Sequence, residues 1–319
     1  MDKNTGGFGP AVQHVFQQAD IYHVWVNVIC IAGALLGLHM AAVTGKRSAA
    51  YISAEIQELL QIPGHMRTVL ALADRIQASA NRLASKNTYW AAVGSGPNKA
   101  AADEIRIKLS ELCYKTISSD YVEDKKHIDL SSEPLIIVCA AGCRGTVIGD
   151  IIKDTAIFKA HKATPIVIAD EQEDRFAPYA EDVFHVPRAS EHLAPVLNTL
   201  VGHLWGSYAA LAINEGSRFL YHFQEKIQRT LADSADQGLD IYELVLEKSF
   251  RQEFAAFYGE FRQRKMHHRL PAALGLETTS DLTLLLNYLA GQDNMVKLPE
   301  AAADCAHLLT PDEAVIVGN

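Results

Sequence analysis

Residues 89–97 read Tyr-Trp-Ala-Ala-Val-Gly-Ser-Gly-Pro, a short apolar run that ends in a glycine turn. A continuous apolar run of this length predicts a strand buried on both faces, which is typical of a parallel sheet. The turn leads into residues 98–113, whose apolar periodicity predicts a helix. Backbone N–H groups around Gly94, Ser95 and Gly96 could bind an anion such as a phosphate at the start of that helix. A tight turn alone could also require the two glycines.

The alternation of strands and helices continues along the next hundred residues. Further strands are predicted at residues 114–118, 135–141, 165–169 and 182–186, and further helices at 147–162 and from about 191 to 214. Strands that alternate with helices predict an α/β fold with a doubly wound parallel sheet.

The regions on either side of this α/β part are predicted to be helical. Residues 1–85 are expected to form an N-terminal arm followed by helices, residues 86–214 the α/β domain, and residues 215–319 a helical extension with a tail. The predicted flanking helices are 22–44, 53–60 and 66–85 before the sheet and 218–232, 240–265 and 281–291 after it.

Three charged residues share one face of the predicted helix 98–113. Glu104, Lys108 and Glu111 are spaced i, i+4 and i+7. Two carboxylates that flank an ammonium group can form a proton-transfer set, because each charge shifts the pKa of its neighbours. The same spacing is also typical of a solvated ladder of salt bridges, and the helix alone does not separate the two interpretations.

A second candidate lies in the loop Gly142-Cys143-Arg144-Gly145-Thr146, directly after the predicted strand 135–141. Open α/β sheets bind ligands at the carboxyl ends of their strands. Arg144 could hold a phosphate through its guanidinium fork and Thr146 through its hydroxyl. A plain turn is the alternative interpretation.

The glycine turn, the charged helix and the segment Glu-Asp-Lys-Lys-His at residues 123–127 together resemble the second sugar isomerase (SIS) domain of glucosamine-6-phosphate synthases, also called glutamine–fructose-6-phosphate aminotransferases. The resemblance extends over residues 22–213 and is strongest from 89 to 170. An E-x-K-H-like segment is typical of the family, whereas this chain has one extra residue before His127 and no Gly-Pro after it.

The resemblance implies a flavodoxin-like three-layer αβα fold and isomerase chemistry on a hexose 6-phosphate such as fructose 6-phosphate, without a cofactor. It implies that Glu111 moves a proton between C1 and C2 of the sugar, that Lys108 and Glu104 assist at the hydroxyl groups, and that His127 opens the sugar ring. Because the family's His reaches a neighbouring subunit, it also implies a homodimer. The substrate-binding candidates are Gly94, Ser95, Gly96, Arg144 and Thr146.

Other features of the family are not found. The glutamine-hydrolysing domain, most of the first SIS domain with its phosphate loop, and the Schiff-base lysine are not recognisable, and Lys226 has only a similar position. The chain is therefore expected to be part of a longer synthase-like protein or a diverged relative, which a first SIS domain or an amidotransferase partner could complete. A non-catalytic phosphosugar sensor and a dimerisation domain stay open as alternatives.

Composition limits the other classes of function. A net charge of −9 argues against general nucleic-acid binding, and the basic residues at 262–269 are interpreted as a solvated helix end that could also meet an anionic partner. Five cysteines without a CxxC pair indicate reduced thiols, no metal site and a cytoplasmic protein. The apolar segment 24–43 approaches the ~20 residues of a membrane span, but Asn27 and His39 within it favour a buried helix.

Overall fold

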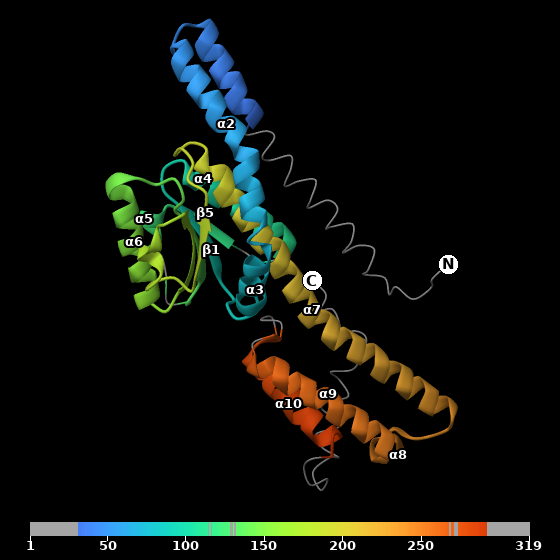
Figure 1. The fold of residues 1–319 in the computed structure, drawn as a ribbon. Coiled ribbons are helices and arrows are strands. Elements are labelled where there is room, and N and C mark those ends of the chain that lie inside the picture. Colours follow the sequence, from blue (N-terminus) through green and yellow to red (C-terminus); the bar gives the residue numbers. More distant parts are fainter. Residues whose placement is uncertain are drawn as a thin grey trace, which may run out of the picture. The chain divides into compact units, whose positions relative to one another are not determined.

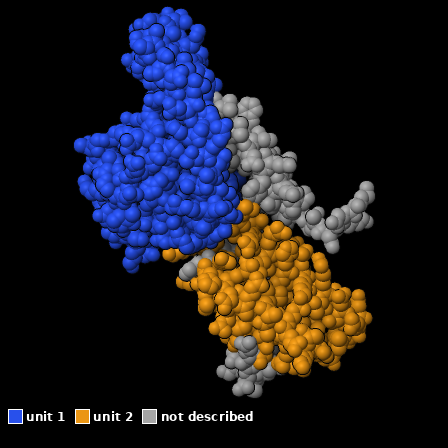
Figure 2. Space-filling view, viewed as in Figure 1, with its two compact units in different colours: residues 1–83, 89–210 blue, residues 84–88, 211–319 orange. Residues whose placement is uncertain are grey.

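A computed structural model of the chain describes residues 31–113, 115, 117–127, 130, 132–267, 269–270 and 274–291. The chain divides into two compact units (Figure 2). Unit 1 comprises Met1–Leu83 and Tyr89–Ala210, and unit 2 comprises Ala84–Thr88 and Leu211–Asn319. Unit 1 contains the sheet, and the described part of unit 2 from Leu211 onward consists of helices joined by short turns.

Unit 1 is built on a five-stranded sheet in which every neighbouring pair is parallel. Its strands are β1 (Trp90–Gly94), β2 (Ile117–Asp120), β3 (Leu135–Cys139), β4 (Thr164–Asp170) and β5 (Asp182–Val186). Their order is β2-β1-β3-β4-β5, so the chain reverses its direction of winding between β1 and β3. Every residue of β1, β3 and β4 is buried, which explains their continuous apolar runs.

Helices cover both faces of the sheet and give three layers, so the predicted doubly wound αβα fold is confirmed (Figure 1). The helices are α4 (Asn98–Cys113), α5 (Val122–Lys125), α6 (Gly145–Ala160) and α7 (Ala194–Asp236). Ala91 and Val93 belong to the core cluster that α6 covers with Phe158. Trp90 points to the other face, where its ring meets Trp205 of α7 edge to face at 5.2 Å.

Two glycines let α7 approach α4 closely. A Cβ atom added to Gly202 would lie 2.4 Å from the Ile105 side chain, and one added to Gly206 would lie 2.6 Å from the Leu109 side chain. The two glycines are one helical turn apart and therefore lie on the same face of α7. This contact fixes the position of α4, the helix that carries the charged stripe.

The N-terminal helices of unit 1 differ from the prediction at one point. Helix α2 (Ala49–Leu70) runs through Pro63 without a break, and α3 (Ala73–Leu83) follows it, so the predicted division at residues 62–64 is wrong. A proline removes one hydrogen bond of the helix ladder. Burial of Leu59, Ile62 and Val69 on the same helix offsets that loss.

The predicted helix 22–44 is described from residue 31 onward. Residues Ile31–Val43 are helical, and Ile31 and Leu38 pack against the cluster that contains Leu59 and Leu193, whereas residues 22–30 lie outside the described part. Within the described residues, α7 alone has the length and apolar composition needed to cross a membrane. Its most apolar window is 67% buried, as in the core helix of a globular domain.

Helix α7 has 43 residues and continues through the predicted end at residue 214; its residues up to Ala210 belong to unit 1 and those from Leu211 onward to unit 2. The sequence predicts separate helices up to residue 214 and from 218 to 232, but the Gly216 between them costs a helix only about 1 kcal/mol. The predicted helix 240–265 is two helices, α8 (Ile241–Leu246) and α9 (Lys248–Met266), because Glu247 is extended. They are followed by α10 (Leu276–Leu289).

Aromatic side chains form the core of unit 2. Phe223 of α7 stacks on Phe257 of α9 with ring centroids 3.4 Å apart, and it meets Phe254 edge to face at 5.1 Å. Leu286 of α10 belongs to the same buried cluster. This core is separate from that of the sheet and gives unit 2 its own stabilising interior.

Candidate functional site

The loop after β1 is a tight turn that uses its own hydrogen-bonding groups. A Cβ atom on Gly94 would lie 2.2 Å from the carbonyl oxygen of Asn98, and Gly96 has a φ of +57°. The N–H groups of residues 98–100 donate to the carbonyl groups of residues 95–97 over 3.1–3.2 Å. The turn therefore requires both glycines, and it uses the N–H groups of residues 98–100 at the start of α4 for its own hydrogen bonds.

Buried polar side chains join this turn to its neighbours. Ser95 is buried and its Oγ donates to Oε2 of Glu123 over 2.9 Å. Asn98 Nδ2 donates to the carbonyl oxygen of Ala141 over 2.8 Å, and Asn198 Nδ2 of α7 donates to Asn98 Oδ1 over 2.9 Å. Sequence reasoning missed both asparagines, although an Asn at a core position of a helix is itself a signal of a buried hydrogen bond.

Asp170, at the end of β4, organises the loop after β3. It is buried, and its Oδ1 accepts a hydrogen bond of 2.9 Å from the N–H of Gly142, while its Oδ2 pairs with the guanidinium group of Arg144. Arg144 also donates to the carbonyl oxygen of Ala189 over 3.0 Å. The charge of Arg144 is thus balanced within the chain, and Thr146 is exposed in the first turn of α6.

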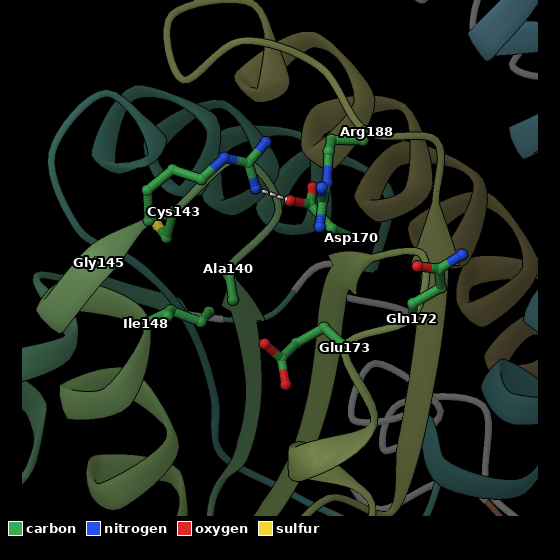
Figure 3. A pocket seen from close by; sticks show the side chains of 9 residues that line it. Ala140, Cys143, Gly145, Ile148, Asp170, Gln172, Glu173 and Arg188 are labelled. Carbon is green, nitrogen blue, oxygen red and sulfur yellow. Dashed lines mark hydrogen bonds and ion pairs between the residues drawn. The ribbon is translucent and has the colours of Figure 1, made fainter.

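Two neighbouring cavities open at this carboxyl edge of the sheet, and both are lined by Arg144 and Arg188. The first has a volume of about 170 Å³, and Figure 3 shows Asp170, Glu173 and Arg188 around it. The second has a volume of about 360 Å³ and extends from Arg188 to α2. Arg188 was not among the predicted site residues, because nothing in the local sequence distinguishes it from any other surface arginine.

The charged stripe on α4 is present as predicted, and its members have partners. Lys108 Nζ lies 2.8 Å from Glu111 Oε2; the lysine side chain is 9% exposed and the glutamate side chain 57% exposed. Glu104 Oε1 lies 3.3 Å from Nε2 of His203, a fully buried residue of α7 that the sequence analysis did not select. The stripe is therefore a carboxylate at the surface, an almost buried ammonium group and a carboxylate next to a buried imidazole.

The stripe and the carboxyl edge of the sheet are far apart within one chain. Glu111 follows Asn98 by 13 residues along α4, which at about 1.5 Å per residue is ~20 Å. Asn98 lies at the carboxyl end of β1, next to the loop after β3. Neither of the two cavities is lined by Glu104, Lys108 or Glu111. One hexose phosphate cannot touch both Arg144 and Glu111 of the same chain.

His127 lies in the turn after α5 and is exposed. Its N–H donates to the carbonyl oxygen of Asp124 over 2.9 Å, and among the described residues its ring has no hydrogen bond or ion pair with the stripe on α4. The two lysines before it form ion pairs that stabilise the fold. Nζ of the buried Lys125 lies 3.6 Å from Oδ2 of Asp120, and Nζ of Lys126 lies 2.9 Å from Oδ1 of the buried Asp154.

Lys226, the possible metal ligands and the cysteines were the remaining candidates for a functional role. Lys226 is exposed in unit 2 and pairs with Glu253 at 2.8 Å. Among the residues that the structure describes, no group of three His, Cys, Asp or Glu side chains could hold a metal ion. Cys113, Cys139 and Cys143 are free and buried, whereas the other two cysteines lie outside the described part.

Cys143 is expected to be a slow nucleophile although it lines the first cavity. Burial, opposed by a hydrogen bond from Asn98, raises the pKa of the Cys143 thiol to about 11. Because the thiolate is the reactive form, alkylation by iodoacetamide at pH 8 should be about a hundredfold slower than in the urea-unfolded chain. Peptide mass spectrometry of timed samples measures both rates, and equal rates would contradict the expectation.

Comparison with known proteins agrees with this fold. No family model matches the sequence. The chain is 30% identical over 182 residues to the glutamine–fructose-6-phosphate aminotransferase (isomerizing) of Methanosarcina acetivorans, covering 56% of this chain and 29% of that protein. It is 29% identical over 174 residues to the enzyme of the same name from Mycolicibacterium smegmatis, covering 53% of this chain and 28% of that protein. It thus spans less than a third of the length of these relatives.

A solved structure supports the same assignment of the fold. The C-terminal domain of glucosamine-fructose-6-phosphate aminotransferase from Francisella tularensis superimposes with a TM-score of 0.52 at 18% identity, over 56% of this chain and 50% of that chain. At 18% identity this likeness concerns the fold alone. The evidence for a common origin is the sequence identity of about 30% to the two aminotransferases named above. The chain is therefore a homologue of the isomerase region of glutamine–fructose-6-phosphate aminotransferases, and it has the α/β fold of a SIS domain.

Proposed function

We propose that the chain is a phosphosugar-binding SIS domain with aldose–ketose isomerase chemistry on fructose 6-phosphate or a similar hexose 6-phosphate. The observation that carries the proposal is the stripe on α4, where Lys108 lies 2.8 Å from Glu111 and Glu104 lies 3.3 Å from His203. Its support is the homology to aminotransferases named as isomerizing. We place the protein in the cytoplasm on the same basis.

The chemistry follows from the charges of the stripe. Glu111, which is the more exposed carboxylate, removes a proton from C1 of the open-chain ketose. Lys108 gives a proton to the oxygen on C2, which produces a neutral enediol. Glu111 then returns its proton to C2, while the hydroxyl group on C1 gives its proton back to Lys108, so that C1 becomes the aldehyde carbon of the aldose. Glu104 accepts and returns hydroxyl protons, and His127 assists ring opening.

A second surface must complete the pocket around Glu111. Neither of the two cavities reaches the stripe, and the carboxyl edge with Gly94, Ser95, Gly96, Arg144 and Thr146 is ~20 Å away along α4. In the proposal the wall comes from another subunit of a homodimer, which would also supply His127, or from a first SIS domain or amidotransferase partner. The substrate's phosphate would then be held by that second surface.

Deuterium exchange tests the proposal. Fructose 6-phosphate is incubated with the protein in heavy water and followed by NMR, and we expect deuterium at C1 or the formation of glucose 6-phosphate. Glu111→Gln should lower the exchange rate about 10²- to 10⁴-fold, because it removes the base. Asp150→Asn, which changes an exposed carboxylate on α6, should not lower it. Unchanged exchange in Glu111→Gln would place the base elsewhere.

The second candidate function is a phosphosugar sensor without turnover. It is favoured by the distance of ~20 Å along α4 between the loops of the carboxyl edge and Glu111. A ligand at those loops would be bound beyond the reach of the base. Line broadening of fructose 6-phosphate without any deuterium incorporation would support this function over the isomerase.

A further inference from the structure

We infer that His203 of α7 is a positioning residue for Glu104, to which it donates a hydrogen bond through Nε2 when the proposed isomerase binds its substrate. The inference rests on the proposed function, in which Glu104 accepts and returns the hydroxyl protons of the sugar. His203 is completely buried, and its Nε2 lies 3.3 Å from Oε1 of Glu104. Both residues belong to unit 1.

The backbone on either side of this pair is fixed by a close contact between α4 and α7. Gly202 precedes His203, and a Cβ atom added to it would lie 2.4 Å from the side chain of Ile105, which follows Glu104. A methyl group would therefore not fit between the two helices at this point. The packing of α7 on α4 thus sets the distance from which the imidazole reaches the carboxylate.

The imidazole approaches Glu104 from the interior of unit 1. The side chain of His203 has no exposed surface, whereas that of Glu104 is 25% exposed. The exposed part of Glu104 can meet a substrate at the surface, while His203 cannot touch one. A carboxylate only accepts hydrogen bonds, so the inference requires that Nε2 of His203 carries a proton.

The pair is at ion-pair distance but is not aligned as a hydrogen bond, since Nε2 of His203 is a buried atom that does not form one in this structure. Hydrogen bonds among catalytic groups are often long or poorly aligned in the free enzyme and tighten in the complex with substrate. We expect the bond to close when a sugar hydroxyl group meets Glu104. Closure would hold the carboxylate in one orientation for the transfer of protons.

Core packing alone would favour an apolar side chain at position 203. The residues around it on α7 include Leu200, Val201 and Trp205, which are buried. An imidazole that is fully buried loses its hydrogen bonds with water and requires polar partners inside the protein. Glu104 is such a partner, and it is also a member of the stripe to which the chemistry is assigned.

The kinetics of deuterium exchange into fructose 6-phosphate test the role of His203. His203→Leu removes the donor, and we expect it to lower kcat about 10- to 100-fold. KM should stay within about threefold, because a buried ring does not touch the substrate. His203→Gln offers an amide N–H instead and should restore most of kcat. An unchanged kcat in His203→Leu would overturn the inference.

Trp205→Phe is the control for a loss of stability without a loss of positioning. It breaks the hydrogen bond of 3.1 Å from Nε1 to Ser79 Oγ on the same helix, so it should lower stability and leave kcat within about twofold. A loss of kcat in Trp205→Phe equal to that in His203→Leu would overturn the inference, because destabilisation of α7 would then explain both.

A double substitution measures the coupling to Glu104. Glu104→Gln alone should lower kcat, and the addition of His203→Leu should lower it by no more than about twofold further, since the group that His203 positions is already changed. Losses that multiply would overturn the inference, because His203 would then act independently of Glu104.

Nitrogen-15 NMR of the histidine rings tests the contact without any activity. His203→Gln identifies the signals of the His203 ring. Nε2 should carry a proton at pH 7, and its signal should shift in Glu104→Gln; an Nε2 without a proton would overturn the inference. A protonated Nε2 that responds to Glu104→Gln, in a protein without deuterium exchange, would refute the isomerase alone. Exchange that depends on Glu111 but not on His203 would refute this inference alone.

Discussion

Gly94→Ala is expected to destabilise unit 1 by about 3 kcal/mol or more. The new Cβ atom would lie 2.2 Å from the carbonyl oxygen and 2.5 Å from the carbonyl carbon of Asn98. Both atoms belong to the backbone of the first turn of α4, so no side-chain rotation relieves the clash. The helix must move away from β1, and the hydrogen bond from Asn98 Nδ2 to the carbonyl oxygen of Ala141 would be lost with it.

Urea unfolding followed by circular dichroism measures this effect as a lower midpoint. Gly149→Ala is the matched control, because Gly149 lies inside α6 and an added Cβ atom meets nothing within 4 Å. That substitution should stabilise the protein by up to about 1 kcal/mol, since alanine restricts the unfolded chain and favours a helix. Equal midpoints for the two variants would show that the turn after β1 adapts more easily than its geometry indicates.

Trp205→Ala should cost about 3–5 kcal/mol, which is the usual range for removing a buried tryptophan. The Trp205 side chain is fully enclosed, at 1% exposure. Its Nε1 donates to Ser79 Oγ of α3 over 3.1 Å, and its ring packs edge to face on Trp90 of β1. One side chain therefore holds α3, α7 and the sheet together.

The same unfolding measurement separates the ring from its hydrogen bond. Trp205→Phe keeps an aromatic ring and loses the bond to Ser79, so its midpoint should lie between those of the original protein and Trp205→Ala. Tyr89→Ala serves as the control, since that side chain is 57% exposed and should change stability by no more than about 0.5 kcal/mol. A midpoint for Trp205→Ala close to that of Tyr89→Ala would contradict the expectation.

Most of the α/β part could be predicted from the sequence, because the spacing of apolar residues and the turn residues that end each element are local features. The runs at β1, β3 and β4 are buried on both faces, and short apolar runs bounded by turn residues are typical of strands that lie between two layers. Apart from the bounds of β2, predicted at 114–118 and found at Ile117–Asp120, and the division of the predicted helix 240–265 at Glu247, the failures concern the continuity of helices at two places, namely Pro63 inside α2 and the uninterrupted α7. In both places the free-energy cost of one residue that disfavours a helix is offset by the burial of apolar side chains elsewhere on that helix.

The sequence by itself determined the order of most strands and helices along the chain. It also determined that Glu104, Lys108 and Glu111 lie on one face of α4, since helical spacing decides which residues share a face. Only the tertiary structure decided what those residues and the loops meet. His203 lies against Glu104 although 99 positions separate them in sequence, and Arg188 reaches one cavity with His65 of α2. Such pairs depend on how α2, α4 and α7 pack on the sheet, and no local pattern encodes the packing of distant segments.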